Sequence, residues 1–158
     1  MAIEIRKPSE SEVAEIIRMM RDFAEFESLS QYFENTLEKL TQAIFGASAY
    51  VEALIAVGDG QYAGYALFFP FYASFRGQCG YYLDDLYVDD AFRGKGIGEA
   101  FLKEIALMGK ERGVERIDFQ VLEWNSPAIK FYEKLGAVKD DDERHFKFVD
   151  AAFDALSG

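Results

Sequence analysis

The segment from Arg93 to Gly98 has the composition of a main-chain binding site for an anion. Its glycines let the backbone approach a phosphate without a Cβ in the way. Amide N–H groups at the start of a following helix would point at the anion, and the helix dipole favours negative charge there. Arg93 and Lys95 add positive charge to a chain that is otherwise acidic. The simpler interpretation is a helix-capping loop with two exposed bases.

The spacing of these glycines excludes two common phosphate-binding motifs. A P-loop requires Gly-x-x-x-x-Gly-Lys-Ser/Thr, which the sequence does not contain. A dinucleotide-binding fingerprint requires Gly-x-Gly-x-x-Gly in the first strand–helix–strand unit. Here Gly94, Gly96 and Gly98 come late in the chain with the wrong spacing. The pattern that fits is Arg-x-x-Gly-x-Gly, formed by Arg93, Gly96 and Gly98.

Proton-transfer chemistry depends on a small set of side chains. The Tyr132 phenol, with an ordinary pKa near ~10, is protonated at neutral pH and can donate a proton, although it is one of nine tyrosines. Asp84 and Asp85 offer carboxylates that could bind an amine or accept a proton. Cys79 and His145 are the single cysteine and histidine, which excludes an intrachain disulfide and a Cys/His zinc cluster. We therefore expect a cytoplasmic protein with no metal.

Composition and charge narrow the classes of partner. The 158 residues include 17 Lys and Arg against 28 Asp and Glu, for a formal net charge of −11. Such a chain repels nucleic-acid phosphates and anionic membrane surfaces, so we expect neither as a partner. A cationic small molecule is favoured, although an acidic chain is often simply a soluble one. The sequence has no apolar run long enough for a membrane helix, and its start lacks the pattern of a signal peptide.

These residues must be positioned by alternating strands and helices. Hydrophobic periodicity predicts a single α/β domain over residues 1–158, with a mixed sheet of about six to seven strands flanked by about four helices. Residues 70–80 are aromatic and are predicted to be irregular. The expected strands are 3–5, 50–57, 62–69, 81–88, 114–122 and 146–149, and the expected helices are 9–27, 35–44, 97–113 and 127–135.

The glycine-rich turn and its surroundings resemble the GNAT acetyltransferase superfamily. A strand of the form Leu-x-x-Leu-x-Val, Leu83–Val88, precedes the turn, and a long helix follows it. Asn125, the pair Phe131-Tyr132 and Gly136 are similar to the superfamily's later Asn…Phe-Tyr…Gly helix. Tyr82–Val88 and Glu123–Asn125 look like the branch that acetylates the diamines spermidine and spermine, together with its thialysine-acetylating relatives.

This resemblance implies acetyl-CoA as the acetyl donor. The strand before the turn would pair through its backbone with the pantetheine arm and polarise the thioester carbonyl. The turn itself would hold the pyrophosphate. Because the superfamily is commonly dimeric, we also expect a homodimer. The residues assigned to acetyl-CoA are Leu86, Tyr87, Val88, Arg93, Gly94, Lys95, Gly96, Ile97, Gly98, Glu99 and Asn125.

The resemblance also assigns the acid and suggests the base. Tyr132 occupies the place of the superfamily's general acid, which protonates the departing thiolate. Asp84 aligns with a glutamate of the diamine branch, and its shorter side chain favours a water relay to the amine. Since adjacent strand residues face opposite ways, we expect only one of Asp84 and Asp85 to line the acceptor side. Glu27 is a candidate for binding a distal ammonium.

The predicted function is transfer of an acetyl group from acetyl-CoA to a primary amine by direct attack in a ternary complex. Polyamines, diamines and thialysine-like amino acids are the expected acceptors. The alternatives are an acetyltransferase for a protein N-terminus, a lysine or an aminoglycoside, and a non-catalytic acyl-CoA-binding module. Tyr132 argues against the non-catalytic alternative, because such a module has no need of a general acid.

Overall fold

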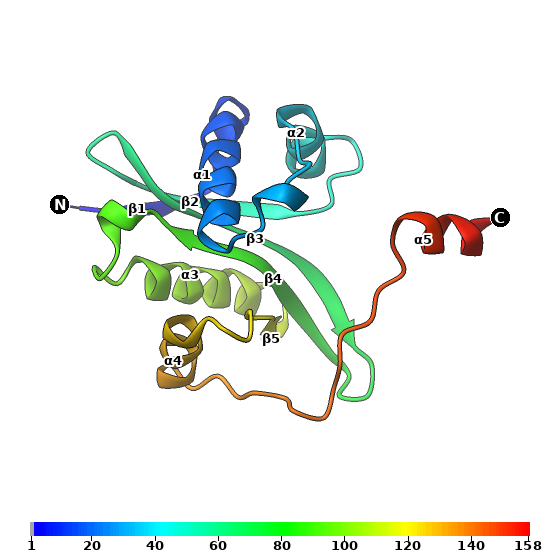
Figure 1. The fold of residues 1–158 in the computed structure, drawn as a ribbon. Helices are drawn as coiled ribbons and strands as arrows, with labels where there is room; N and C mark the ends of the chain where they lie inside the picture. Colours follow the sequence, from blue (N-terminus) through cyan, green and yellow to red (C-terminus); the bar gives the residue numbers. More distant parts are fainter. Residues whose placement is uncertain (1) are drawn as a thin grey trace. The chain divides into compact units, whose positions relative to one another are not determined.

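A mixed five-stranded sheet organises the first part of the chain (Figure 1). The computed structural model describes residues 2–158, which divide into two compact units, one ending at Gln120 and the other comprising Val121–Gly158. The strands follow one another in the order β1-β2-β3-β4-β5, antiparallel from β1 to β4 and parallel between β4 and β5. Their bounds are β1 Glu4–Arg6, β2 Glu52–Gly58, β3 Gln61–Ala73, β4 Gln78–Val88 and β5 Val114–Phe119.

Helices cover both faces of this sheet (Figure 1). Helices α1 (Val13–Phe26) and α2 (Leu37–Phe45) lie on one face, and α3 (Ile97–Glu111) lies on the other. Because side chains alternate along a strand, each face receives its own set of apolar residues. The α1 face buries Val13, Ile16, Met19, Leu40, Ile55, Tyr65 and Tyr87, and the α3 face buries Leu54, Phe68, Tyr81, Leu83, Phe101 and Ile105.

The start of α1 confirms the helix signal in the sequence. The Ser9 backbone N–H donates to Glu12 Oε1 at 2.9 Å, which satisfies one of the amide donors that a helix start leaves open. Glu12 also accepts from Arg6 at 2.8 Å and from the Tyr62 hydroxyl at 2.7 Å. The same carboxylate therefore ties β1 and β3 to the helix start.

The aromatic segment predicted to be irregular is instead a hairpin. Strand β3 continues to Ala73 and β4 begins at Gln78, so the turn between them is short. Pro70 lies inside β3, opposite Tyr81. The β2 ladder ends at Phe68, so beyond that point β3 pairs with β4 alone, and an edge position tolerates the missing proline N–H.

The second unit differs from the prediction. The expected strand Phe146–Val149 is wrong: these residues follow α4 (Ser126–Lys134) without strand pairing and lead into α5 (Asp150–Ser157), a helix that the sequence did not predict. Alternating apolar residues become a strand only beside another strand, and the described elements of this unit are the two helices. The α/β class is confirmed, with five strands and five α-helices in residues 2–158.

Strand β3 lies too close to β4 at Gly64 to accept a side chain there, and this yields a stability prediction. A Cβ at Gly64 would collide with the Tyr87 carbonyl oxygen and would lie 3.3 Å from the Val88 Cα. Gly64→Ala must therefore push the two strands apart, and we expect it to lower the free energy of unfolding by about 1–3 kcal/mol. Urea denaturation measures this loss. Gly60→Asn, in a turn where the added carbon meets no atom within 4 Å and where asparagine tolerates the φ of 73°, should lose less, and equal losses would contradict the steric account.

Candidate active site

Strand β4 contains an extra residue at Asp84. Across β3, Leu67 pairs with Asp85 while the next residue, Phe68, pairs with Leu83, so Asp84 has no partner in this ladder. An extra residue of this kind is a β-bulge, which bends a strand and redirects its side chains. Leu83 therefore faces α3, whereas Tyr87 faces α1, although both have odd numbers. The bulge lies among the candidate residues.

The bulge corrects the expectation that only one of the two aspartates lines the acceptor side. Alternation before the bulge gives Asp84 the face opposite Leu83, and alternation after it gives Asp85 the face shared with Tyr87. Both assignments are the α1 face. The side chains also interact, because the charge on Asp84 raises the pKa of Asp85. The extra residue thus places two neighbouring carboxylates together.

Asp85 is the carboxylate with the most altered protonation. Burial raises its pKa to about 7, with further contributions from the charges of Asp84 and Glu27. The hydroxyl of the fully buried Tyr65 donates to Asp85 Oδ2 at 2.8 Å and partly offsets this rise. Burial also holds the pKa of the Tyr65 phenol well above its usual value. At neutral pH Asp85 is therefore close to half-ionised.

Glu27 completes a group of three carboxylates. It follows the last residue of α1, and burial raises its pKa, as burial also raises that of Asp84. The side chains that shift the pKa of Asp85 are Asp84, Tyr65 and Glu27, all of them acids. Within residues 2–158, no group of three or more His, Cys, Asp or Glu side chains is arranged to hold a metal ion. The three carboxylates give this part of the first unit a concentration of acidic groups.

Beyond the bulge, β4 separates from β5. The β4–β5 ladder runs from Cys79 to Leu83 and ends there, while β4 continues to Val88 alongside β3. Among the described strands, Leu86, Tyr87 and Val88 thus have a ladder partner on one side. Their other backbone edge is the one expected from the sequence to pair with the pantetheine arm.

The glycine-rich turn has the backbone geometry of an anion site. Gly94 and Gly96 have φ of 77° and 79°, a left-handed conformation that glycine adopts without strain. The hydrogen bond from Ala100 N to Gly96 O, at 3.0 Å, is the first of helix α3. The amides of Ile97, Gly98 and Glu99 come before that bond, so the helix itself provides them with no acceptor. These donors, and the open space beside both turn glycines, fit a pyrophosphate.

Charged side chains around this turn are engaged within the first unit. Glu99 pairs with Lys103 at 3.0 Å, and the Lys95 ammonium lies 5.4 Å from the centre of the Phe92 ring. Arg93 donates from Nε to the Val88 carbonyl oxygen at 2.9 Å. The first unit therefore brings the turn, the β4 edge and the carboxylates into one body.

Asn125 and Tyr132 belong to the second unit. Asn125 is buried and caps α4, its Oδ1 accepting from Ala128 N at 3.4 Å. Tyr132 lies on α4, with its ring centre 5.0 Å from that of Phe131. A structural role in α4 is thus established for Asn125, and the catalytic assignment of Tyr132 stays a prediction.

Tyr65 is the residue that sequence reasoning missed. It is one of nine tyrosines, and its contact with Asp85 depends on the strand register, which the sequence does not reveal.

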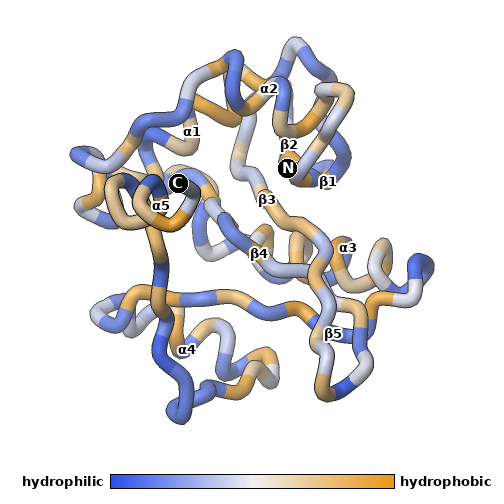
Figure 2. Tube along the Cα trace, turned by 90° about the vertical axis from the view of Figure 1, so that its right-hand side faces the viewer, coloured by the Kyte–Doolittle hydropathy of each residue, from blue (hydrophilic) through white to orange (hydrophobic). Residues whose placement is uncertain are grey.

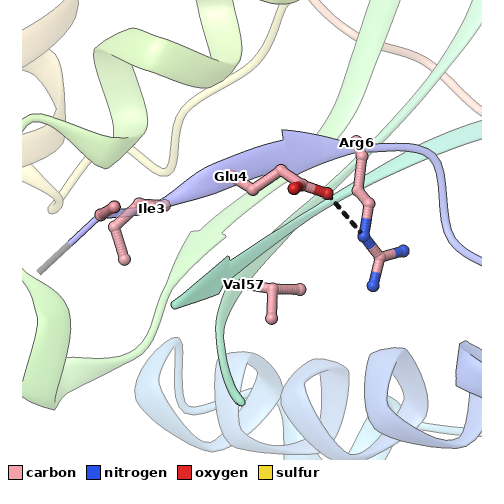
Figure 3. A pocket seen from close by; sticks show the side chains of 5 residues that line it. Ile3, Glu4, Arg6 and Val57 are labelled. Atoms are coloured by element: carbon pink, nitrogen blue, oxygen red, sulfur yellow. Dashed lines mark ion pairs between the residues drawn. The ribbon is translucent and has the colours of Figure 1, made fainter. Parts of the chain in front are cut away.

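A separate hollow of about 370 Å³ lies at the β1 side of the sheet and contains none of the candidate residues (Figure 3). It is lined by Ala2, Ile3, Glu4, Arg6 and Val57, with Glu4 and Arg6 paired at 3.0 Å. No helix of residues 2–158 is both long and apolar enough to cross a membrane.

Known proteins of one family are similar to this chain in sequence. The acetyltransferase (GNAT) family profile matches residues 13–137. The thialysine N-epsilon-acetyltransferase of Mus musculus is 33% identical over 165 aligned positions, covering 98% of this chain and 96% of that protein. The L-ornithine N5-acetyltransferase of Arabidopsis thaliana is 41% identical over 75 positions, covering 48% of this chain and 33% of that protein.

Solved structures share the fold. An integron cassette protein from V. cholerae has a TM-score of 0.83 at 20% identity, covering 99% of this chain and 98% of that one. An aminoglycoside acetyltransferase from an uncultured soil metagenomic sample has a TM-score of 0.77 at 25% identity, covering 96% and 100%.

The family profile and the full-length similarity to curated acetyltransferases show that this α/β protein is an acyltransferase. The chain belongs to the acetyltransferase (GNAT) family.

The raised pKa of Asp85 predicts a pH-dependent gain in stability for Asp85→Asn. The folded-state pKa of about 7 exceeds the unfolded value of 3.8, so the stability contributed by the protonated carboxyl is lost as the pH rises through this interval. Asparagine stays neutral and can still accept from Tyr65. We expect the variant to unfold with a free energy about 1–3 kcal/mol higher than the wild type near pH 8, and with a smaller gain near pH 5.5.

Urea denaturation at the two pH values measures this difference. Asp84→Asn is the matched control, because Asp84 is more exposed and its burial effect is smaller. A gain for Asp85→Asn that does not change with pH would show that the carboxyl is already ionised throughout the interval.

Proposed function

We propose that this protein transfers an acetyl group from acetyl-CoA to a primary amine of a small cationic acceptor: a polyamine, a diamine or a thialysine-like amino acid. The observation that carries the proposal is the group Glu27, Asp84 and Asp85, in which Asp85 has a pKa of about 7. The thialysine and ornithine acetyltransferases among the relatives support it, since both names denote acceptors with an amine.

The acceptor amine arrives as a cation and must lose a proton before it attacks. Carboxylates at the exposed Asp84 and the half-buried Glu27 attract the cation, and the attraction is stronger at Glu27, where less water screens the charges. Asp85 then accepts the proton, because a base is most effective when its pKa lies near the working pH. We therefore assign the base to Asp85, and assign Asp84 to binding the amine or to holding a relay water.

The donor side is assigned to the turn and the β4 edge. The amides of Ile97, Gly98 and Glu99 would hold the pyrophosphate, and the Leu86–Val88 edge would orient the pantetheine arm. When bound, acetyl-CoA supplies the acetyl group as a thioester. Asn125 would contact the arm as well. With donor and acceptor on the protein together, the amine attacks directly in a ternary complex.

Tyr132 is proposed as the general acid. Its phenol is protonated at neutral pH and can donate that proton to the departing sulfur. The assignment is supported by the resemblance of the Phe131-Tyr132 pair to the family's pattern. The ammonium loses two protons on its way to an amide: Asp85 accepts the first before the attack, and the second, released after the attack, replaces the proton that Tyr132 gives to the sulfur. One proton thus remains on Asp85 and passes to solvent before the next turnover.

An aminoglycoside is the second candidate acceptor. The likeness to a metagenomic aminoglycoside acetyltransferase at 25% identity favours it, and aminoglycosides are also cationic amines. The carboxylate group by itself suits both acceptors. The full-length similarity to a thialysine acetyltransferase is the reason that we place the small amine first.

We also propose a homodimer that forms through the C-terminal segment, within a single acetyltransferase domain spanning 1–158. Large apolar side chains lie exposed along residues 138–156, where a second copy of the chain would cover them. The hydropathy colouring of Figure 2 marks hydrophobic residues in α5. Strand β5, at the end of the described sheet, offers an unpaired backbone edge to an alternating segment such as Phe146–Val149. The exposed residues are Val138, Phe146, Phe148, Val149, Phe153 and Leu156.

We also propose a cytoplasmic location, with which the single thiol, Cys79, agrees.

The central prediction concerns turnover. In a thiol-release assay with acetyl-CoA, we expect at least one amine on a panel of polyamines, diamines, thialysine, ornithine and aminoglycosides to accelerate release. For that amine, Asp85→Asn should lower kcat/KM by roughly 10²–10⁴-fold, and Tyr132→Phe should lower kcat by a similar factor. Wild-type kcat/KM should rise about tenfold per pH unit below the pKa of about 7 and then level off, because Asp85 must be ionised to accept a proton.

Glu111→Gln is the control for loss of a carboxylate, since Glu111 is exposed at the end of α3. It should retain wild-type kinetics. Thiol release that no amine accelerates would refute the small-amine proposal, and an aminoglycoside as the one active acceptor would select the second candidate. Full activity of Asp85→Asn would remove Asp85 from the role of base.

The dimer prediction is tested by mass. We expect light scattering after size exclusion to give twice the chain mass of 17.9 kDa for the wild type. Phe146→Asp combined with Phe148→Asp should give the single-chain mass, because burying two added charges is costly. Lys147→Asp, an equally exposed change between them, controls for charge and should stay dimeric. A wild type of single-chain mass would refute the proposal.

A further inference from the structure

The side chain of Arg93 points away from the turn that it begins. Its Nε donates to the Val88 carbonyl oxygen at 2.9 Å, at the end of β4. Its guanidinium carbon lies 4.7 Å from the centre of the Phe26 ring and 5.9 Å from that of Tyr87. The guanidinium also forms an ion pair with the highly exposed Asp90 at 3.4 Å. Arg93 thus joins the end of β4 to the end of α1.

The contact between Arg93 and Phe26 lies next to a candidate acceptor residue. Phe26 is the last residue of α1, and Glu27 is the next residue along the chain. Phe23 packs on Tyr87 of β4 with ring centres 5.4 Å apart, whereas the Phe26 residue at the very end of the helix is 46% exposed and is held by the core only in part. A guanidinium over the ring supplies a directional attraction that persists at an exposed ring, although it is weaker there than at a desolvated one. Arg93 therefore contacts the residue that directly precedes Glu27.

We propose that Arg93 is a positioning residue for the acceptor site: by stacking on Phe26 while bonded to Val88, it fixes the end of α1 against β4 and keeps Glu27 beside Asp85. A residue of the donor turn thereby sets the geometry of the carboxylates on the acceptor side. The inference rests on the proposed function in one respect, that these carboxylates receive the amine.

An arginine is required for this arrangement. Its planar guanidinium can stack on a ring and donate within its own plane at the same time. A lysine keeps the charge but has no plane with which to do both. Because the Val88 carbonyl and the Phe26 ring already engage the guanidinium, its geometry differs from that of a side chain directed at a phosphate.

The first test measures the protonation of Asp85 in the protein without coenzyme. Carboxyl 13C resonances are followed against pH for the wild type, Arg93→Lys, Phe26→Leu and Glu27→Gln. If Arg93 positions Glu27, all three variants lower the pKa of Asp85 by roughly 0.5–1 unit, since each removes or displaces a negative charge beside it. Arg93→Lys introduced into Glu27→Gln should cause no further shift. Arg18→Lys, an exposed arginine of α1, is the control and should leave the pKa unchanged.

The second test separates acceptor from donor. We expect Arg93→Lys to raise the KM for the amine about tenfold and to change the Kd for coenzyme A, measured by calorimetry, less than twofold. Lys95→Ala should show the opposite pattern. If Arg93→Lys instead weakens coenzyme A binding and leaves the pKa of Asp85 unchanged, Arg93 is a phosphate ligand and the inference is overturned. If no amine is acetylated, the proposed function fails while the titration still decides the role of Arg93.

Discussion

The β-bulge at Asp84 is the constraint on which the site depends. One residue without a partner in the β3–β4 ladder shifts the alternation of β4, so that Asp85 and Tyr87 face α1 rather than α3. The same strand leaves its parallel neighbour at Leu83, immediately before the bulge. A bulge bends its strand, which accounts for both effects: paired carboxylates on one face and an open backbone edge for a ligand.

The candidate site holds neighbouring acidic groups whose charges repel one another, and the surrounding core keeps them in place. Asp85 lies against Tyr65 with two further carboxylates nearby, an arrangement that opposes ionisation. Such a group keeps its position because the strands beneath it are packed on both faces by buried apolar residues. The helices contribute differently: α3 presents its N-terminal amides, and α1 delivers Glu27 from its other end. The turn amides and Glu27 thus lie at helix ends, whereas Asp84 and Asp85 lie within β4.

Sequence reasoning anticipated the backbone of the glycine-rich turn better than the arrangement of the carboxylates. The glycine-rich turn depends on local backbone conformation, which Gly94 and Gly96 reveal directly, and the helix after it was predicted from its periodicity. The bulge has no such signature, because Asp84-Asp85 is compatible with regular alternation, and Tyr65 meets Asp85 only through the register of two strands. Phe146–Val149 failed for a related reason: its alternation is that of a strand, but a strand also needs a neighbour. Local patterns were predictable, and pairings between segments were not.

A carboxyl that is half-protonated at neutral pH couples ligand binding to the solvent. A cation that settles beside Asp85 favours its ionised form, so the carboxyl must release its proton as the proposed acceptor binds. The apparent binding enthalpy would then include the heat with which the buffer takes up that proton. Two buffers with different ionisation enthalpies would consequently report different heats for the same binding event, and their difference would count the protons that the Tyr65–Asp85 pair gives up.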